Sequence, residues 1–443
     1  MTVIKKRIAV IGAGISGLTA AWSISKTHNV TLFEEKGYLG GHANTVDVPG
    51  NSKTGIDTGF VVFNEQNYPS FTALLKLLDV QTQSTSMSFA VSLDNGSFEY
   101  SSSTILRSLF NLSNLNSKRF KDLVTGLVKL YGPSGLSESA SMSEQPIGEF
   151  LRCQGFSESF IQDHVLPMTA AIWSSSIEDA ARYPVGPFFA FFKNHRLLSL
   201  FQRLSWKTIS GGSRNYIQNI ENDGDFETKL NCKVVRVERS DRIIRTFFKN
   251  GLSQEFDEVV FANHGDTVLK ILNEPSREER EILGRFKYSK NIAVLHEDKT
   301  FMPTNRKLWS SWNYLRKNTS DVEKSPIFVT YWMNKLHQFE FKRQFFVTLN
   351  PVEKVSDRFA FYETEYSHPI INLESVQASS LSRKIQGRNR SWFCGAYLGA
   401  GFHEDGVQAG LWVANQLGSK KIDSIPTNYS RLPDTYWHSL EDE

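Results

Sequence analysis

The sequence has few cysteines and no long apolar run. Only three cysteines occur in 443 residues, Cys153, Cys232 and Cys394, with no CxxC pair and no histidine at metal-ligand spacing. This pattern argues against a disulfide framework, zinc and iron–sulfur clusters, so we predict no metal site and a reducing, cytoplasmic location. No stretch approaches the roughly 20 apolar residues that cross a bilayer, and no signal-peptide core follows the basic N-terminal residues. We therefore expect a soluble or peripheral protein.

Charge of either sign is also not in excess. The formal net charge is +3, mixed along the chain, with no basic stripe and no nucleic-acid motif, so nucleic acid is excluded as a partner. Hydrophobic content of 40% and charged content of 22% are typical of a globular protein. A chain of this length exceeds one ordinary core and indicates two domains, both discontinuous in sequence.

Aromatic residues, in contrast, are frequent, at 12% of the chain. They concentrate in residues 188–192, 309–312 and 339–346. Most must be core residues, because aromatic side chains dominate burial. We expect a minority to line a long apolar pocket.

The most specific motif lies near the start, where Gly12-x-Gly14-x-x-Gly17 separates an apolar strand at residues 7–11 from a helix at residues 15–25. In a dinucleotide-binding fingerprint the first glycine allows a tight turn, the second admits the pyrophosphate and the third lets helix and strand pack. A second strand, residues 30–33, ends at Glu34, where an acid accepts hydrogen bonds from the adenosine ribose and disfavours a 2′-phosphate. FAD or NAD is therefore predicted over NADP. The alternative, a glycine-rich turn that binds nothing, does not explain why turn, helix, strand and acid agree.

Gly40, Gly41 and His42 follow the second strand directly, as in FAD enzymes of the glutathione-reductase-like and amine-oxidase-like groups. Those enzymes usually carry arginine after the two glycines. A histidine here makes any contact with the cofactor weaker and dependent on pH. The alternative for His42 is a solvated loop residue.

A closing glycine-rich block occupies residues 392–410 and reads as a strand, a loop and the start of a helix that runs to about residue 416. We expect Asp405 to cap this helix, and Gly406, Ala409 and Gly410 to admit a flat ligand. The positive end of the helix dipole would stabilise an anionic reduced flavin.

Between these motifs we predict further elements and a division into domains. The elements are a strand at 55–63, helices at 69–78, 105–115 and 120–131, a loop at 134–144, helices over 146–194, a glycine turn into a helix over 206–220, antiparallel strands at 233–238 and 243–248, a returning strand at 258–262, and strands at 327–333 and 345–349. The fold class is α/β, with a Rossmann-like FAD-binding domain and an interleaved α+β substrate domain. The FAD domain comprises residues 1–80, 206–270 and 385–418, the substrate domain 81–205 and 271–384, and a C-terminal tail 419–443.

The chain resembles the FAD-dependent amine oxidase and phytoene desaturase superfamily. Within it, the sequence is most similar to the flavoprotein domain fused to plant cyclopropane fatty acid synthases and its stand-alone microbial relatives. The blocks that carry this similarity are residues 38–46, 172–174, 194–198, 211–214, 329–332 and 393–410.

The resemblance implies roles for particular residues. The backbone of Val235 would meet the adenine, residues 261–264 the ribityl and phosphate groups, and residues 405–407 the flavin pyrimidine. Ala396 departs from the acidic residue of many relatives. The lysine that amine oxidases place near flavin N5 corresponds to Lys290 or Asn291, and Phe402 replaces a tyrosine of the amine cage.

Other single residues are expected to be structural. His195, His264 and His403 are assigned to loop or core positions, and Cys394 to a small buried hydrophobe. No catalytic residue is assigned. The residues predicted to bind FAD are Gly12, Gly14, Ile15, Ser16, Gly17, Glu34, Gly40, Gly41, His42, Val235, Gly395, Asp405, Gly406 and Val407.

The leading functional hypothesis is an FAD-dependent oxidoreductase that takes a hydride from a lipid-like, fatty acyl substrate onto flavin N5. One alternative is an oxidase of small amines, and another is a flavoprotein partner of a fatty-acyl methyltransferase without net redox chemistry. Residues 188–206 combine Phe, Leu and Trp with basic residues, which suits a helix at a membrane surface or the rim of a lipid tunnel. Burial against the flavin domain is the alternative for that segment.

Overall fold

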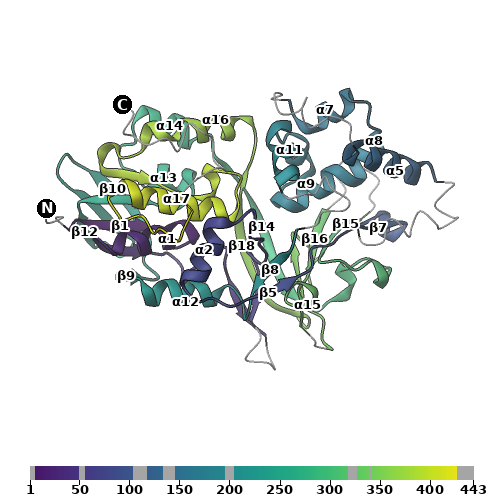
Figure 1. Ribbon diagram of the computed structural model, residues 1–443, viewed down its shortest axis with the longest axis horizontal. Coiled ribbons are helices and arrows are strands. Elements are labelled where there is room, and N and C mark those ends of the chain that lie inside the picture. Colours follow the sequence, from purple (N-terminus) through teal and green to yellow (C-terminus); the bar gives the residue numbers. More distant parts are fainter. Residues whose placement is uncertain are drawn as a thin grey trace.

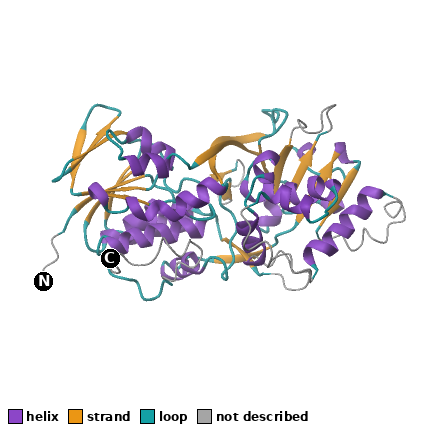
Figure 2. Ribbon diagram, turned by 90° about the horizontal axis from the view of Figure 1, so that it is seen from above, coloured by secondary structure: helices purple, strands orange, loops and turns teal. Residues whose placement is uncertain are grey.

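The computed structural model describes residues 5–48, 55–102, 117–132, 145–194, 204–317, 327–339 and 342–426. The molecule is elongated, and its two main sheets lie at different places along the long axis, with strands and loops crossing between them (Figures 1 and 2). Helices surround the first sheet at one end, and a separate group of helices covers the other end (Figure 1).

The first sheet is parallel and has five strands in the order β19-β13-β1-β2-β9. Its members are β1 (Arg7–Ile11), β2 (Asn29–Phe33), β9 (Phe226–Lys229), β13 (Glu258–Phe261) and β19 (Ser391–Phe393). Both faces of β1 are buried, which explains its continuous apolar sequence. The predicted strands at 7–11, 30–33 and 258–262 are confirmed.

Helices and a small antiparallel sheet share the core of this parallel sheet. The helices are α1 (Ile15–Ser25), α2 (Pro69–Leu77), α12 (Arg214–Asp223), α13 (Gly265–Ile271), α14 (Arg277–Leu283), α16 (Leu373–Leu381) and α17 (His403–Gln416). The antiparallel sheet, β10 (Val234–Arg239), β11 (Ile244–Phe248) and β12 (Ser253–Phe256), lies between β9 and β13 in sequence. The predicted strand pair at 233–238 and 243–248 is thereby confirmed.

The second large sheet has seven strands, all antiparallel to their neighbours except for the parallel pair β15 and β6. In spatial order they are β18 (Ala360–Ile370), β14 (Lys287–His296), β17 (Phe346–Leu349), β16 (Ile327–Trp332), β15 (Trp312–Arg316), β6 (Phe89–Leu93) and β7 (Phe98–Ser101). The predicted strands at 327–333 and 345–349 are confirmed. Two short pairs, β3 (Thr45–Asp47) with β4 (Gly55–Asp57) and β5 (Thr82–Thr85) with β8 (Trp206–Ile209), complete the strand pairing of the described chain.

A second hydrophobic core joins the group of helices at the far end of Figure 1 to one face of this sheet. Its helices are α5 (Lys118–Tyr131), α7 (Ile147–Cys153), α8 (Glu158–Phe160), α9 (Leu166–Trp173), α10 (Ile177–Ala181) and α11 (Val185–Asn194), with a π-helical turn at Ile161–Val165 between α8 and α9. The short helix α15 (Met333–Leu336) and 3₁₀ turns at Asp94–Gly96, Lys299–Phe301, Arg306–Leu308, Ser382–Ile385, Arg388–Arg390 and Ala396–Leu398 account for the remaining helical segments.

Three predicted elements differ in extent from the structure. In the segment predicted at 206–220, Trp206–Ile209 form β8, and the helix after the glycine turn, α12, runs to Asp223. The strand expected at 55–63 ends at Asp57, because Thr58 and Phe60 donate their backbone N–H groups to Asn44 and His42 in the neighbouring loop. Helix α5 begins two residues before the predicted start, where the hydroxyl oxygen of Ser117 accepts from the N–H of Phe120. The predicted helix at 105–115, the loop at 134–144, residues 195–203 and most of the tail lie outside the described residues.

The strands divide between the two sheets along the predicted segments. Every strand of the parallel sheet comes from residues 1–80, 206–270 or 385–418, and every strand of the seven-stranded sheet from the other set. Helices α14 and α16, however, belong to the second set by sequence and are buried in the core of the parallel sheet. The domain limits themselves stay a prediction. In the described part of the chain, no helix combines the length and apolarity that a membrane span requires.

Candidate active site

The three glycines of the first motif have different surroundings. Gly12 has a φ of 104°, and a Cβ on Gly17 would lie 1.8 Å from the carbonyl oxygen of Gly12. A Cβ on Gly14, in contrast, would have no atom within 4 Å. Gly12 and Gly17 are therefore required by the fold itself, whereas Gly14 faces open space at the N-terminus of α1.

The double glycine lies directly against this loop. Gly40 donates its N–H to the carbonyl oxygen of Ala13 at 2.8 Å and forms an isolated parallel bridge with Gly14. A Cβ on Gly41 would lie 3.1 Å from the Cα of Gly14. Two motifs separated by a helix and a strand thus form one surface.

Glu34 and Val235 stand at the outer side of the loop. The carboxylate of Glu34 accepts from the backbone N–H groups of Ala13 and Lys36, both at 2.9 Å. Val235 is the bulged residue in the pairing of β10 with β11 and is 40% exposed. A bulge frees backbone groups from the ladder, and this is the geometry that recognition through the backbone requires.

The N-terminus of α17 corrects two expectations. The helix begins at His403, so Asp405 is its third residue, and the Asp405 Oδ2 accepts from the N–H of Phe402 at 2.7 Å. A Cβ on Gly406 would lie 2.7 Å from Ile15, and one on Gly410 would lie 2.4 Å from the carbonyl oxygen of Ser16. The space at Gly406 and Gly410 is therefore taken by α1 and not by a flat ligand. Because of this close packing, helices α1 and α17, which lie at residues 15–25 and 403–416 of the sequence, meet at one place.

A cavity of about 760 Å³ extends from the two glycine loops to the helices of the second core. Gly14, Ile15, Ser16, Gly40, His42 and Gly395, all predicted to bind FAD, line it. The other predicted residues lie behind or beside the lining: Gly12, Gly17, Glu34, Gly41, Val235, Asp405, Gly406 and Val407. Asp405, Gly406 and Val407 are buried.

Among the described residues, Asp57 is the only lining side chain of a charged type besides histidine. Its Oδ1 accepts from the hydroxyl of Thr45 at 2.6 Å and from the N–H of Ser213 at 2.9 Å. Burial raises the pKa of Asp57 to about 6. This residue was missed as a site residue, although it lies in the strand predicted at 55–63.

Five histidines line the cavity, and burial lowers the pKa of each: His42, His164, His264, His368 and His403. His403 stacks on Phe60 with ring centroids 3.7 Å apart, and its Nε2 lies 2.8 Å from the Tyr216 hydroxyl. His264 stacks on Tyr288 at 4.3 Å. Both were assigned only to loop or core positions, because a sequence does not show which loops converge on a cavity. His195 lies outside the described residues.

The two residues that correspond to the amine-oxidase lysine are absent from the cavity lining. Lys290 has a side chain that is 75% exposed and pairs with Glu365 at 3.0 Å. Asn291 is buried, and its Nδ2 lies 2.9 Å from Nδ1 of His368. Neither residue lines the cavity.

The aromatic wall of the cavity includes Phe402, which stacks on Phe191 with ring centroids 4.9 Å apart. Phe188, Phe189 and Phe192 of the same helix are buried in the second core, whereas Lys193 and Asn194 at its end are exposed. Cys394 is fully buried and burial raises the pKa of its thiol, as expected for a small hydrophobe.

Comparison with known proteins gives the family. Residues 15–337 match the family model described as flavin containing amine oxidoreductase. The chain belongs to this family. No curated protein sequence matches it significantly.

Solved structures of flavin amine oxidoreductases and related proteins share the fold at low identity. A proposed protoporphyrinogen oxidase from Exiguobacterium sp. 255-15 has a TM-score of 0.70 at 15% identity, over 94% of this chain and 99% of the other. A CLA-producing fatty acid isomerase from P. acnes has a TM-score of 0.63 at 14% identity, over 93% of this chain and 98% of the other. Putrescine oxidase bound to putrescine has a TM-score of 0.64 at 13% identity, over 94% of this chain and 100% of the other.

As a member of this family, the protein is an FAD-dependent oxidoreductase of α/β fold. The residues present fit that cofactor. Open space at Gly14 lies at the positive end of α1, where a phosphate group is stabilised. The imidazole ring of His42 stacks on Tyr366 beside this loop. Its Nε2 is buried and has no hydrogen-bond partner in the described part of the chain. The burial of this nitrogen also overturns the alternative that His42 is a solvated loop residue.

Proposed function

We propose that the protein takes a hydride from an apolar, lipid-like substrate, a fatty acyl chain, that occupies the part of the cavity beyond the glycine loops. The observation that carries this proposal is the character of the lining: apart from Asp57, its described residues are apolar, aromatic, small polar or neutral histidine. An acyl chain gains free energy from burial in such surroundings, whereas an unpaired ion loses it. The fold shared with a fatty acid isomerase is compatible with this substrate class.

In this proposal the cofactor spans the two ends of the chain. Gly12, Gly14, Ile15, Ser16 and Gly17 hold the diphosphate at the start of α1, with Gly40, Gly41 and His42 beside it, and Glu34 and the backbone of Val235 hold the adenosine. Gly395, which lines the cavity, faces the flavin ring, and the start of α17, with Asp405, Gly406 and Val407, is buried behind it. Bound FAD supplies the hydride acceptor.

The side chains of the cavity position the substrate and exclude water from it. Phe402, Phe191 and Trp173 form a wall that excludes water and holds a substrate C–H at a reacting distance of about 3–3.5 Å from its acceptor. Transfer of a hydride leaves a carbocation, which becomes an alkene when the adjacent carbon loses a proton. A neutral base such as a histidine of the lining can take this proton, so no charged acid–base pair is needed. The lining is consistent with that requirement.

Oxidation of small amines is the second candidate, and the Asp57 carboxylate favours it because an ammonium ion seeks an anion. The exposed position of Lys290 and the missing hydroxyl at Phe402 oppose it. A methyltransferase partner, proposed from the resemblance, would make the protein a flavoprotein without net redox turnover.

Anaerobic mixing of the purified flavoprotein with phospholipid-bound unsaturated acyl chains, and separately with putrescine and cyclohexylamine, tests these proposals. We expect loss of the oxidised-flavin absorbance with the lipid alone. Loss with the amines alone rejects the lipid substrate. A spectrum that changes with neither donor, together with co-purification of a methyltransferase, supports the non-redox role.

A further inference from the structure

Three hydrogen-bonded side chains stand together in the cavity lining at its helical end. Tyr100 comes from β7, Tyr131 from the end of α5, and His164 from the π-helical turn between α8 and α9. The Tyr100 hydroxyl lies 2.9 Å from Nδ1 of His164, and the Tyr131 hydroxyl 2.9 Å from its Nε2. We refer to Tyr100, Tyr131 and His164 as the distal cluster. None of the three was singled out from the sequence.

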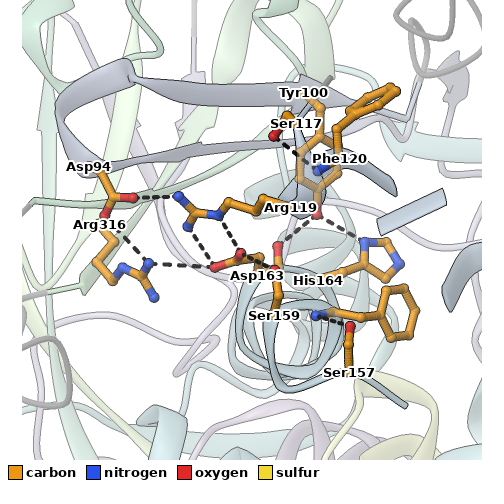
Figure 3. A network of polar contacts seen from close by, with 11 residues as sticks. Asp94, Tyr100, Ser117, Arg119, Phe120, Ser157, Ser159, Asp163, His164 and Arg316 are labelled. Carbon is orange, nitrogen blue, oxygen red and sulfur yellow. Dashed lines mark hydrogen bonds and ion pairs between the residues drawn. The ribbon is translucent and has the colours of Figure 1, made fainter. Parts of the chain in front are cut away.

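Proline at position 167 explains one hydrogen bond of this cluster. In an α-helix the carbonyl oxygen of Asp163 would accept from the N–H of residue 167, but proline has none. The helix forms a π turn at Ile161–Val165, and the hydroxyl of Tyr100 donates to the Asp163 carbonyl at 2.8 Å (Figure 3). A carbonyl oxygen cannot donate, so the single proton of Tyr100 is committed here.

The remaining protons follow from this assignment. Because the Tyr100 proton points to Asp163, the oxygen of Tyr100 can only accept from His164, which places the imidazole proton on Nδ1. Burial lowers the pKa of His164 to about 3, so the ring is neutral and its Nε2 accepts from the hydroxyl of Tyr131. The phenol oxygens thus have lone pairs left, and no donor.

Four charged residues fix the π turn and balance one another. Arg119 donates to both carboxylate oxygens of Asp163, at 2.6 and 2.8 Å, and to Asp94 at 2.6 Å (Figure 3). Arg316 lies 3.5 Å from both carboxylates. Two guanidinium groups and two carboxylates balance, so these four residues place no net charge beside the distal cluster. An ammonium ion bound there would be desolvated without a counter-ion.

We infer that the distal cluster is a subsite for a neutral hydroxyl group of the substrate, which donates its proton to the free lone pair of Tyr131, far along the cavity from the glycine loops. The inference rests on the proposed function, because it places a polar end on the acyl-type substrate. A substrate with an ester or ether oxygen at that end offers only an acceptor, and it would face other acceptors.

Binding of three matched probes to the FAD-loaded protein, measured by calorimetric titration, tests this subsite. Decan-1-ol offers a hydroxyl proton, 1-methoxydecane lacks it, and decylammonium carries a charge. We expect decan-1-ol to bind about five- to tenfold more tightly than the ether, the effect of one hydrogen bond with a neutral partner. In Tyr131→Phe the ratio should fall to about one.

Tyr314→Phe is the matched control. The Tyr314 hydroxyl is buried in the same hydrophobic core, has no hydrogen-bond partner in the described part of the chain and does not line the cavity. Its removal should leave the ratio unchanged.

An alcohol-to-ether ratio near one in the unaltered protein overturns the inference, even if no variant can be made. A ratio that survives Tyr131→Phe, or decylammonium binding more tightly than the alcohol, also overturns it. These outcomes do not depend on turnover. A protein that never transfers a hydride from lipid but prefers the alcohol refutes the proposed function and leaves the subsite standing.

Discussion

At the scale of single residues, some glycines of the first loop are needed for folding and another is needed for binding. Gly12 and Gly17 are surrounded by backbone atoms, while Gly14 has open space in front of it and ordinary backbone angles, with φ −70° and ψ 179°. Those angles are accessible to any L-residue. Gly14 is therefore the position at which a methyl group interferes with a ligand and not with the protein.

We predict that Gly14→Ala leaves the thermal unfolding of the apoprotein unchanged but weakens FAD binding at least about tenfold, because a methyl group occupies the space of the diphosphate. Gly17→Ala is the control, since its Cβ meets the Gly12 carbonyl at 1.8 Å and should destabilise the protein itself. Fluorescence titration with FAD and thermal denaturation give the two quantities. Unchanged FAD affinity in Gly14→Ala would contradict the cofactor placement.

His42 provides a second prediction at this scale. Burial, the largest cause, and neighbouring His368 and His264 lower its pKa, so it is neutral at pH 7 without ligand. The negative diphosphate would raise that pKa, so FAD binding should take up a proton and tighten as the pH falls from 8 to 6. His42→Arg should bind FAD more tightly with a flatter pH profile, as measured by titration at each pH. An identical pH profile in both proteins counts against a contact between His42 and the cofactor.

At the scale of helices and strands, a few close contacts hold one element against another. Helices α1 and α17 come from opposite ends of the sequence and pack so closely that Gly410 lies under the Ser16 carbonyl. Small residues in α17 were recognised from the sequence, but their partner was not, because a pattern in one segment does not show which other segment lies against it.

We predict that Gly410→Ala destabilises the protein by about 2–3 kcal/mol, since a Cβ 2.4 Å from the Ser16 oxygen forces the two helices apart. Gly148→Ala in α7 is the matched control, because its Cβ would lie 3.2 Å from the nearest atom and the gain in helix propensity offsets the crowding. Urea denaturation of both variants gives the comparison. Equal stabilities would show that the α1–α17 contact is looser than described.

The sequence predicted elements best where one local rule decides them. The bounds of β1 and α1 followed from apolar runs around a glycine turn, and the hairpin of β10 and β11 from alternation. The predicted strand at 55–63 was too long because Thr58 and Phe60 bond to a loop more than ten residues away. The distal cluster was not predictable, because tertiary packing brings its three residues together. The sequence also does not show which hydroxyl replaces the N–H that Pro167 lacks.

At the scale of the whole molecule, buried histidines dominate the expected response to pH. Seven have a lowered pKa: His42, His164, His264, His296, His337, His368 and His403. Desolvation by burial is the largest cause in each. A lowered pKa contributes stability that is present above about pH 6.5 and is lost as the pH falls. Asp57 and Glu404 act in the opposite direction, because burial raises their pKa values and this favours the folded state on acidification, but they are two groups against seven histidines.

We therefore predict that the free energy of unfolding of the apoprotein falls from pH 7 to pH 5, with a loss of up to about 2 kcal/mol for each histidine that stays neutral. Urea denaturation at several pH values measures this slope. His296→Gln removes a buried histidine outside the cavity lining. It should reduce the dependence of the free energy of unfolding on pH by the contribution of one histidine. A stability that is constant or rises on acidification contradicts the prediction.

The order of strands along the chain has a consequence for synthesis. The chain visits the parallel sheet with β1 and β2 and leaves it for β6 and β7. It returns with β9 and β13, which flank the small sheet in sequence, leaves again for β14 to β18 and closes the edge only with β19. The last helix to pack on α1 ends at Gln416. A nascent chain on the ribosome thus exposes an unfinished sheet edge and an uncovered face of α1 until β19 and α17 have been translated, and premature termination before residue 416 leaves a product that cannot complete its flavin site.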